Sequence, residues 1–252
     1  MIIALILMSS AMALAWLVQM LKSNCSWVDM CWTYGVGITA VAILLTVPSP
    51  RRWWMMAAIV AWSLRLGTSI ALRSAGKRED PRYHKYRGEW GANFQRHMFW
   101  FLQFQALVSW PILFGIWGAA GNKTAFGIHD VIALIIAFGS IAGEGLADTQ
   151  LTGFRRSHPH SGICDVGLWR WSRHPNYFFE TLFWCALPFF AAPLPAAMAL
   201  ACLAPLTIYI LLNYVSGIPP LEAYMLKTRG DDFRAYQART SAFFPLPPGP
   251  SK

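Results

Sequence analysis

The chain has 252 residues, of which 56% are hydrophobic and 13% are charged. Because soluble domains are about one quarter charged, this composition excludes a single water-surrounded core and predicts an all-α polytopic membrane protein. The net charge is +9. The lysines and arginines lie between apolar stretches, as in loops beside a membrane, and this distribution argues against a nucleic-acid partner.

Seven stretches are apolar enough to cross a bilayer, for which a helix needs roughly 20 residues. The chain is therefore predicted to form one integral membrane domain over 1–252 with about seven transmembrane helices. They are expected at about 2–21, 33–47, 54–72, 99–119, 130–147, 177–193 and 196–215. The first is interpreted as a helix and not a signal peptide, because Lys22 follows the apolar run and no positive charge precedes it. Ala192-Pro193-Leu194-Pro195 predicts a tight turn between the last two helices.

Basic residues gather in three segments, at 73–98, at 149–176 and in the tail from 217. The positive-inside rule places all three in the cytoplasm and the N-terminus outside, with Arg51 and Arg52 as a mild exception. All three segments mix cations with aromatic residues, which favours a soluble anionic ligand on the cytoplasmic face.

The cysteines and histidines give no metal or disulfide signature. Five cysteines form no C-x-x-C pair, and six histidines form no H-E-x-x-H motif. No metal site is predicted.

Two polar pairs stand out in the apolar helices, where polar side chains usually mark function. Glu144 and Asp148 are four residues apart near the inner end of the fifth helix, so they share a face. Such a pair favours a cation, a sugar hydroxyl or a shared proton, although salt bridges to the basic loop are the alternative. Asn176 and Glu180 form a second pair at the start of the sixth helix.

The stretch 167–180 is the densest run of cationic and aromatic residues in the chain. Pro175 suits a first helical position, and the free N–H groups of that first turn form an anion site. Arg170, Arg173 and His174 add positive charge just before it, which fits a phosphate-bearing ligand. The alternative is a cluster of cations at the lipid headgroups. In the tail, Phe233-Arg234-Ala235-Tyr236 offers a cation and a phenol, or forms an interfacial helix.

Two charged residues of the first half of the chain lie in or beside apolar runs. Asp29 is expected between the first two helices, and Arg65 lies inside the third apolar run, where a lone charge needs a partner. The two are one possible ion pair, structural or catalytic.

Several segments together form a pattern that covers nearly the whole chain. They are Val28-Asp29-Met30-Cys31-Trp32, Leu64-Arg65-Leu66-Gly67, Glu79-Asp80-Pro81-Arg82-Tyr83, Glu144-Gly145-Leu146-Ala147-Asp148-Thr149-Gln150, Arg173-His174-Pro175-Asn176-Tyr177 with Glu180, and Thr240-Ser241-Ala242-Phe243-Phe244-Pro245. In this order they resemble the membrane steroid 5-alpha-reductase-like family, in particular its bacterial branch, the DUF1295 group.

The resemblance implies a seven-helix oxidoreductase of the bacterial inner membrane, with NADPH bound at its cytoplasmic end. The implied reaction is hydride transfer to the β-carbon of a conjugated C=C–C=O in a steroid or other lipid. The positions that match the family's cofactor residues are Glu144, Asp148, Arg155 (or Arg156), Arg173, Asn176, Glu180 and Tyr236. Arg170, His174 and Tyr177 are expected to complete this site. Asparagine and carboxylates suit ribose and the nicotinamide amide, and arginines suit phosphates.

The chain departs from the family pattern at the substrate end. Steroid-active members place a Tyr on the third helix and a Glu or Gln on the second to polarise the substrate carbonyl. Here the third helix has no Tyr and the second no carboxylate. The nearest candidates for this catalytic role are Asp29, Tyr34 and Arg65, with Tyr83 further along the chain.

Two other functional classes remain open. Isoprenylcysteine and phospholipid methyltransferases carry a similar Arg-His-Pro-x-Tyr at a helix start and use S-adenosylmethionine. The two polar pairs fit the reductase pattern better. A non-enzymatic membrane protein is the third interpretation, supported by the missing carbonyl-polarising pair.

Overall fold

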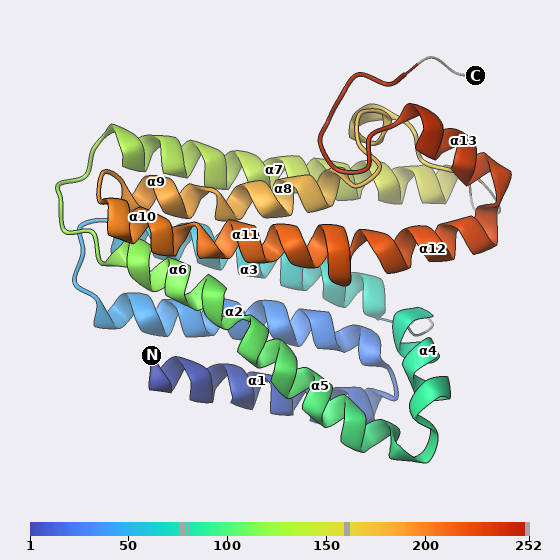
Figure 1. The fold of residues 1–252 in the computed structure, drawn as a ribbon, viewed down its shortest axis with the longest axis horizontal. Helices are drawn as coiled ribbons and strands as arrows, with labels where there is room; N and C mark the ends of the chain where they lie inside the picture. Colours follow the sequence, from blue (N-terminus) through green and yellow to red (C-terminus); the bar gives the residue numbers. More distant parts are fainter. Residues whose placement is uncertain (76–78, 80, 159–161, 250–252) are drawn as a thin grey trace. The chain divides into compact units, whose positions relative to one another are not determined.

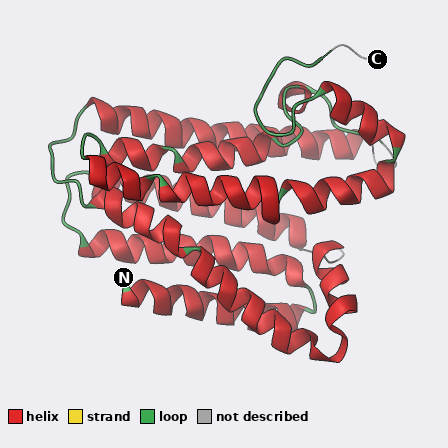
Figure 2. Ribbon diagram, in the orientation of Figure 1, coloured by secondary structure: helices red, strands yellow, loops and turns green. Residues whose placement is uncertain are grey.

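The structure is a computed structural model that describes residues 1–75, 79, 81–158 and 162–249. Within these ranges the chain forms helices joined by loops, without any strand (Figure 2). Six helical stretches are long and apolar enough to cross a membrane, which confirms the all-α polytopic membrane fold. They are Ile2–Lys22, Cys25–Thr46, Arg52–Ser74, Tyr86–Ala120, Ile128–Ser157 and Pro195–Arg229. Lys77, Arg78 and Asp80 of the predicted basic loop lie outside the described residues, as does the side chain of Arg82.

The chain divides into two compact units. Unit 1 comprises Met1–Leu134 and Leu187–Ala204, and unit 2 comprises Ile135–Ala186 and Pro205–Lys252. That residues 1–252 act as one domain stays a prediction.

Unit 1 is built around three long helices that lie side by side, namely α1 (Ile2–Lys22), α2 (Val28–Thr46) and α3 (Arg52–Ser74) (Figure 1). The 3-10 turn η1 (Cys25–Trp27) joins α1 to α2. Small residues let α2 and α3 approach closely, since a Cβ on Gly37 would lie 2.4 Å from the Ser63 Oγ. α2 begins five residues earlier than predicted, so Asp29 lies on its first turn and not between two helices.

The next part of unit 1 runs back across these helices. α4 (Pro81–Trp90) lies across the helix ends, and a short turn, η2 (Gly91–Asn93), leads into α5 (Phe94–Val108) and α6 (Trp110–Ala120) (Figure 1). α5 packs on α1, and α10 (Pro195–Ala201) packs on α6.

Polar side chains join α1 to α5 inside this apolar bundle. The Ser9 hydroxyl donates to the Gln103 Oε1 over 2.6 Å, and the Gln19 amide donates to the Gln95 Oε1 over 2.7 Å. Because lipid offers no hydrogen-bond partner, such contacts hold membrane helices together and fix their register. The two pairs run in opposite directions along the sequence, so α1 and α5 are antiparallel.

Proline explains why three predicted spans are broken. Breaks at Ser109, Cys185 and Cys202 each come two or three residues before a proline. Proline has no N–H for the preceding turn, and its ring clashes with the carbonyl four residues back. The predicted span 177–193 is thus divided into α8 (Pro175–Trp184) and α9 (Ala186–Ala191), and it is not among the six long stretches.

Unit 2 contains most of α7 (Ile128–Ser157), α8 and the C-terminal helices. The others are η3 (Gly167–Arg170), α11 (Leu203–Ile210, from Pro205 onward), η4 (Leu211–Val215), α12 (Ile218–Arg229) and α13 (Asp231–Arg239). α7 continues ten residues beyond the predicted end at 147, because no proline interrupts it before 157. Arg155 therefore lies on the helix and not in a loop, and Asp148 lies on the helix as predicted.

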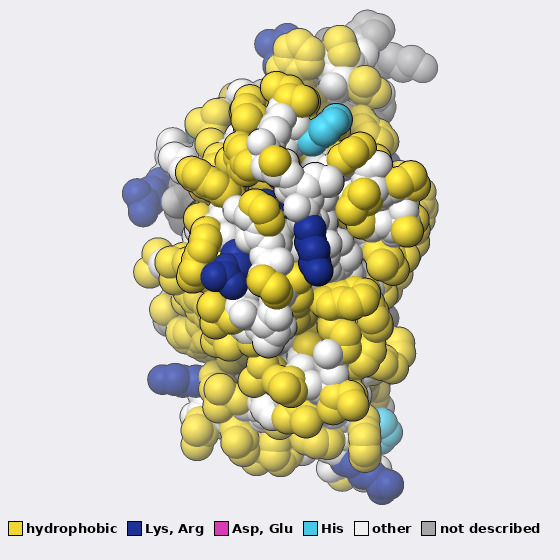
Figure 3. All heavy atoms as spheres, turned by 90° about the vertical axis from the view of Figure 1, so that its left-hand side faces the viewer, with side chains coloured by type: hydrophobic (Ala, Val, Ile, Leu, Met, Phe, Trp, Pro, Cys, Tyr) yellow, Lys and Arg dark blue, Asp and Glu magenta, His cyan; other side chains and the backbone are white. Residues whose placement is uncertain are grey.

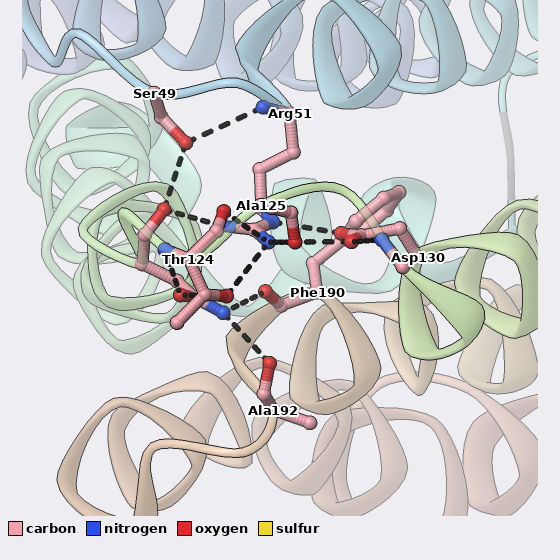
Figure 4. A network of polar contacts seen from close by, with 9 residues as sticks. Ser49, Arg51, Thr124, Ala125, Asp130, Phe190 and Ala192 are labelled. Carbon is pink, nitrogen blue, oxygen red and sulfur yellow. Dashed lines mark hydrogen bonds and ion pairs between the residues drawn. The ribbon is translucent and has the colours of Figure 1, made fainter.

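A buried arginine holds the loops at one end of unit 1 (Figure 4). Arg51 is 1% exposed, and its guanidinium donates to both carboxylate oxygens of Asp130, over 2.7 and 3.2 Å. It also donates to the backbone carbonyls of Asn122, Thr124 and Ala125. Arg51 is therefore paired inside the fold, which accounts for its exception to the positive-inside pattern.

The same network reaches a third loop through Asn122, which is fully buried. Its side-chain amide donates to the carbonyls of Phe190 over 3.0 Å and of Ala192 over 2.7 Å, and its own carbonyl accepts from the Ser49 hydroxyl (Figure 4). Figure 3 views the molecule from the side on which these loops lie. Hydrophobic side chains cover most of that face among the described residues, with a few basic side chains between them.

We expect Asp130→Ala to lower the free energy of unfolding by about 3–5 kcal/mol, because it leaves the Arg51 charge buried without its counter-ion. Thermal unfolding of the purified protein in detergent measures this change. Lys123→Ala alters an exposed residue of the same loop and should leave the midpoint unchanged. An Asp130→Ala protein that unfolds at the wild-type temperature would contradict the role of this pair.

Candidate functional site

The stretch before α8 in unit 2 is fixed against α7. The Leu168 N–H donates to the Gln150 Oε1 over 2.9 Å, and the Trp169 indole donates to the Ala147 carbonyl over 2.9 Å. Gly167 has φ of +57°, and a Cβ there would lie 2.5 Å from the Gln150 side chain. Glycine is therefore required at the point where the chain turns into η3.

Two residues of the Arg-His-Pro motif bind one carboxylate. The Arg173 guanidinium donates to both oxygens of Glu222, over 2.7 and 3.1 Å, and the His174 Nε2 lies 3.0 Å from the Glu222 Oε1. Glu222 also accepts from the Gln237 amide over 2.7 Å. These contacts join the start of α8 to α12 and α13, and we call them the Glu222 clamp.

The C-terminal segment wraps around the same place. The Arg173 N–H donates to the Ser241 carbonyl over 2.8 Å, and its guanidinium donates to the carbonyls of Gln237 and Thr240. The Ser172 hydroxyl donates to the Phe243 carbonyl over 2.8 Å. Arg173 is thus occupied by the protein itself, where the sequence predicted a phosphate ligand.

Tyr236 is likewise part of this packing. Its ring is buried, and its hydroxyl donates to the Trp169 carbonyl. Burial raises the pKa of the Tyr236 phenol above its ordinary value. The hydroxyl links α13 to η3, where the sequence predicted a contact to the cofactor.

His174 is 4% exposed, and its ring stacks on Tyr177 with the centroids 5.3 Å apart. Burial lowers the pKa of the imidazole below its ordinary value, although the hydrogen bond and the charge of Glu222 act in the opposite direction. A neutral imidazole can still donate from Nε2 to the Glu222 carboxylate. His174 therefore helps to hold the helix start.

The predicted acidic and amide residues lie on two helices that pack closely. A Cβ on Gly143 of α7 would lie 2.4 Å from the Phe179 ring of α8, so the two helix surfaces are in contact. The buried face of α7 includes Glu144, which is 4% exposed. On α8, Glu180 is 7% exposed and accepts from the Trp184 indole over 2.9 Å.

Asn176 is half-buried on the first turn of α8. Its side-chain Oδ1 is buried and has no hydrogen-bond partner in the part of the chain that the structure describes. A buried acceptor without a partner costs about 1–3 kcal/mol, so a ligand that supplies an N–H or O–H group would be favoured here. Asn176 follows Pro175, which occupies the first turn of α8 as predicted.

Exposed cations lie near the ends of these helices. Arg155 and Arg156 are exposed in the last turn of α7, and Arg170 is exposed in η3. Exposed guanidinium groups can bind phosphate from solvent, which the half-buried Arg173 cannot do without leaving Glu222. The structure therefore separates the predicted arginines into a structural one and exposed ones.

The predicted catalytic residues belong to unit 1. Tyr34 lies with its ring against Gly67 and its hydroxyl 3.1 Å from the Thr68 Oγ1. Arg65 is partly buried on α3. Asp29 accepts a hydrogen bond from the hydroxyl of Tyr83 on α4 over 3.3 Å. Tyr34 follows Asp29 by five residues, so the helix turns the two side chains about 140° apart.

Two of these hydrogen-bond partners were not predicted from the sequence. Glu222 is 48 residues beyond His174, and Tyr83 is 54 beyond Asp29. Tyr83 is 3% exposed, which is unusual for a residue expected in a loop. Glu222 follows Pro219-Pro220 in a helix with a single acid, which is the one signal the sequence offered.

A family model described as "Protein of unknown function (DUF1295)" matches residues 15–240. The chain belongs to this family. All of the predicted site residues lie within the matched range. The chain is also similar to the protein described as "Uncharacterized protein C594.04c" of the fission yeast Schizosaccharomyces pombe, with 28% identity over 274 residues. The match covers 91% of the chain and 75% of the yeast protein. No solved structure matches the chain.

The lowered pKa of His174 makes the stability of this DUF1295 protein depend on pH. The native imidazole takes up its proton at a lower pH than the imidazole of the unfolded chain, whose ordinary pKa is 6.5. Stability is therefore lost as the pH falls from about 6.5 toward the folded pKa, by at most about 1.4 kcal/mol per pH unit.

His174→Gln keeps a donor for Glu222 but removes the titration. We expect its thermal midpoint in detergent to fall less than that of the wild type between about pH 7 and pH 5. Parallel curves for the two proteins would show that His174 does not titrate in this way.

Proposed function

We propose that this DUF1295 protein is an NADPH-dependent membrane reductase of the steroid 5-alpha-reductase-like superfamily, acting in a bacterial inner membrane. It would transfer a hydride to the conjugated C=C bond of a steroid-like or other lipid enone. The proposal places the basic segments and the cofactor site on the cytoplasmic side, following the positive-inside rule.

One observation carries the proposal. The buried Oδ1 of Asn176 has no hydrogen-bond partner among the described residues, on a helix that packs against α7 and its buried Glu144. Carboxylates and an amide oxygen accept hydrogen bonds, so they suit a ligand rich in donors. Ribose hydroxyls and the nicotinamide carboxamide are such donors, and Asp148, Tyr177 and Glu180 extend the same surfaces.

The phosphates of the cofactor need cations. Arg155, Arg156 and Arg170 are exposed and suit this role, since a guanidinium binds phosphate in a bidentate way. Arg173, His174 and Tyr236 then act as positioning residues, because the Glu222 clamp and the Trp169 contact fix the start of α8. NADPH would supply the hydride, and the protein would orient it and exclude water.

The reaction also needs a group that polarises the substrate carbonyl and a proton for the reduced product. In unit 1, the Tyr83 hydroxyl is the best candidate, because Asp29 orients it over 3.3 Å. A phenol beside a carboxyl group corresponds to the Tyr and the Glu or Gln of the steroid-active members. Asp29 lies on the second helix, as the resemblance implies, whereas Tyr83 lies on α4 and not on the third helix. This assigns to Tyr83 the role for which the sequence suggested Tyr34 and Arg65.

The test of the cofactor is binding by the purified protein in detergent, with NADPH, NADH and S-adenosylmethionine compared by titration calorimetry. We expect NADPH to bind and Asn176→Ala to weaken it about tenfold, as for the loss of one hydrogen bond. Glu180→Ala should weaken it too, whereas Asp232→Asn on the exposed face of α13 should not. Tight binding of S-adenosylmethionine without NADPH would instead support a methyltransferase.

The test of Tyr83 is the rate of NADPH oxidation with a steroid enone as acceptor. We expect Tyr83→Phe to lower kcat about 100-fold or more, since it removes an acid but keeps the aromatic packing. NADPH affinity should stay the same. Tyr86→Phe, on the same helix, serves as the control. A Tyr83→Phe enzyme with the wild-type kcat would rule out this assignment.

A further inference from the structure

A half-open hollow lies in unit 1 where η2 meets α5. Its volume is about 450 Å³, and Asn93, Arg96, His97 and Trp100 line it. This volume falls in the range of about 300–1,000 Å³ that is usual for ligand sites. None of these four residues belongs to the candidate site of unit 2 or to the Tyr83–Asp29 pair.

The side chains of the hollow suit a phosphate group beside an apolar one. Arg96 is exposed and carries a permanent charge. The His97 ring is held in place by stacking on Trp90, with the centroids 5.6 Å apart, and by a contact of its Nδ1 with the Asn93 carbonyl over 3.0 Å. A guanidinium next to indole rings is typical of the headgroup level of a membrane.

A second cation lies at the same end of the helix pair. The Gln19–Gln95 hydrogen bond places the last turn of α1 beside the first turn of α5. Lys22, which is exposed, ends α1 one turn beyond Gln19, and Arg96 follows Gln95 directly. The charge of Arg87 on α4 is already met by Glu79 over 3.0 Å. Among the side chains that the structure describes at this corner, Lys22 and Arg96 are thus exposed cations that can attract an anion.

An apolar surface continues from the hollow along α5. Trp100, Phe104 and Leu107 are 63%, 60% and 56% exposed, and their spacing places them on one face of the helix with Arg96. The opposite face of α5 is buried through Met98, Leu102 and Ala106. The cationic end of this face suits the phosphate headgroup of a phospholipid, and its apolar side chains suit an acyl chain.

We propose that the hollow at Arg96, His97 and Trp100 binds the phosphate headgroup of an anionic phospholipid, with an acyl chain along Phe104 and Leu107. Charge complementarity selects an anionic lipid over a zwitterionic one, since a choline group would meet Arg96 and Lys22 with like charge. The site would hold the α4–α5 corner at the membrane surface independently of the proposed reductase activity.

The test is native mass spectrometry of the full chain in detergent, with dioleoylphosphatidylglycerol or dioleoylphosphatidylcholine added. The wild type should retain the phosphatidylglycerol and not the phosphatidylcholine. Arg96→Gln should weaken this binding about fivefold, as expected for the loss of one cation near an anionic lipid. Arg96→Lys should restore it, and Arg229→Gln, which removes an exposed cation of α12, should leave it unchanged.

Three results would overturn the proposal. Equal losses in Arg96→Gln and Arg229→Gln would mean unspecific attraction to charge. Equal retention of the two lipids would remove the role of the headgroup charge. Competition by glycerol 3-phosphate at the concentration of the lipid would identify a soluble phosphate ligand instead. Because Arg96 is exposed, equal thermal midpoints of the variants confirm that folding is unaffected.

Discussion

The carboxylate of Glu222 receives hydrogen bonds from Arg173, Gln237 and His174, and the arrangement of unit 2 around the start of α8 depends on this contact. A half-buried guanidinium needs a counter-ion, because removing charge from water is costly. Once Arg173 is bound to Glu222, its remaining N–H groups reach the carbonyls of Gln237 and Thr240. One ion pair thus joins α8, α12, α13 and the C-terminal segment.

Unit 1 also contains a buried cation that needs a counter-ion. Arg51 is buried, and its donors are taken by Asp130 and by the carbonyls of one loop. In both units a cation that looks like a surface charge in the sequence fixes loops at a helix end. Charge counting alone therefore overestimates the cations available to a ligand or to the membrane surface. Arg96 and Lys22 remain exposed, so they are stronger candidates for binding an anion at the α4–α5 corner.

The features that the sequence predicted correctly are those that depend on neighbouring residues. Apolar length located the spans, and Pro175 located the start of α8, because both depend on neighbouring residues. The breaks at Ser109 and Cys185 were also encoded locally, by the prolines that follow them. The partners of Arg173 and Asp29 could not be predicted in this way. Glu222 and Tyr83 are about fifty residues away from them, and composition does not indicate which distant residues come into contact. The predicted cofactor residues include Arg173, His174 and Tyr236, whose side chains bind other parts of the chain around the start of α8.

The Arg-His-Pro-Asn-Tyr motif can now be divided at its proline. Arg173 and His174, directly before Pro175, are not helical, and their side chains form the Glu222 clamp. After it, the helical repeat places Asn176 and Glu180 on one face of α8, one turn apart. Because the clamp fixes where α8 begins and the proline fixes its backbone, the orientation of Asn176 is set by residues that need no contact with a ligand. The first half of the motif therefore builds the helix start, and its second half places Asn176 and Glu180 on the face of α8 where the proposed cofactor would bind.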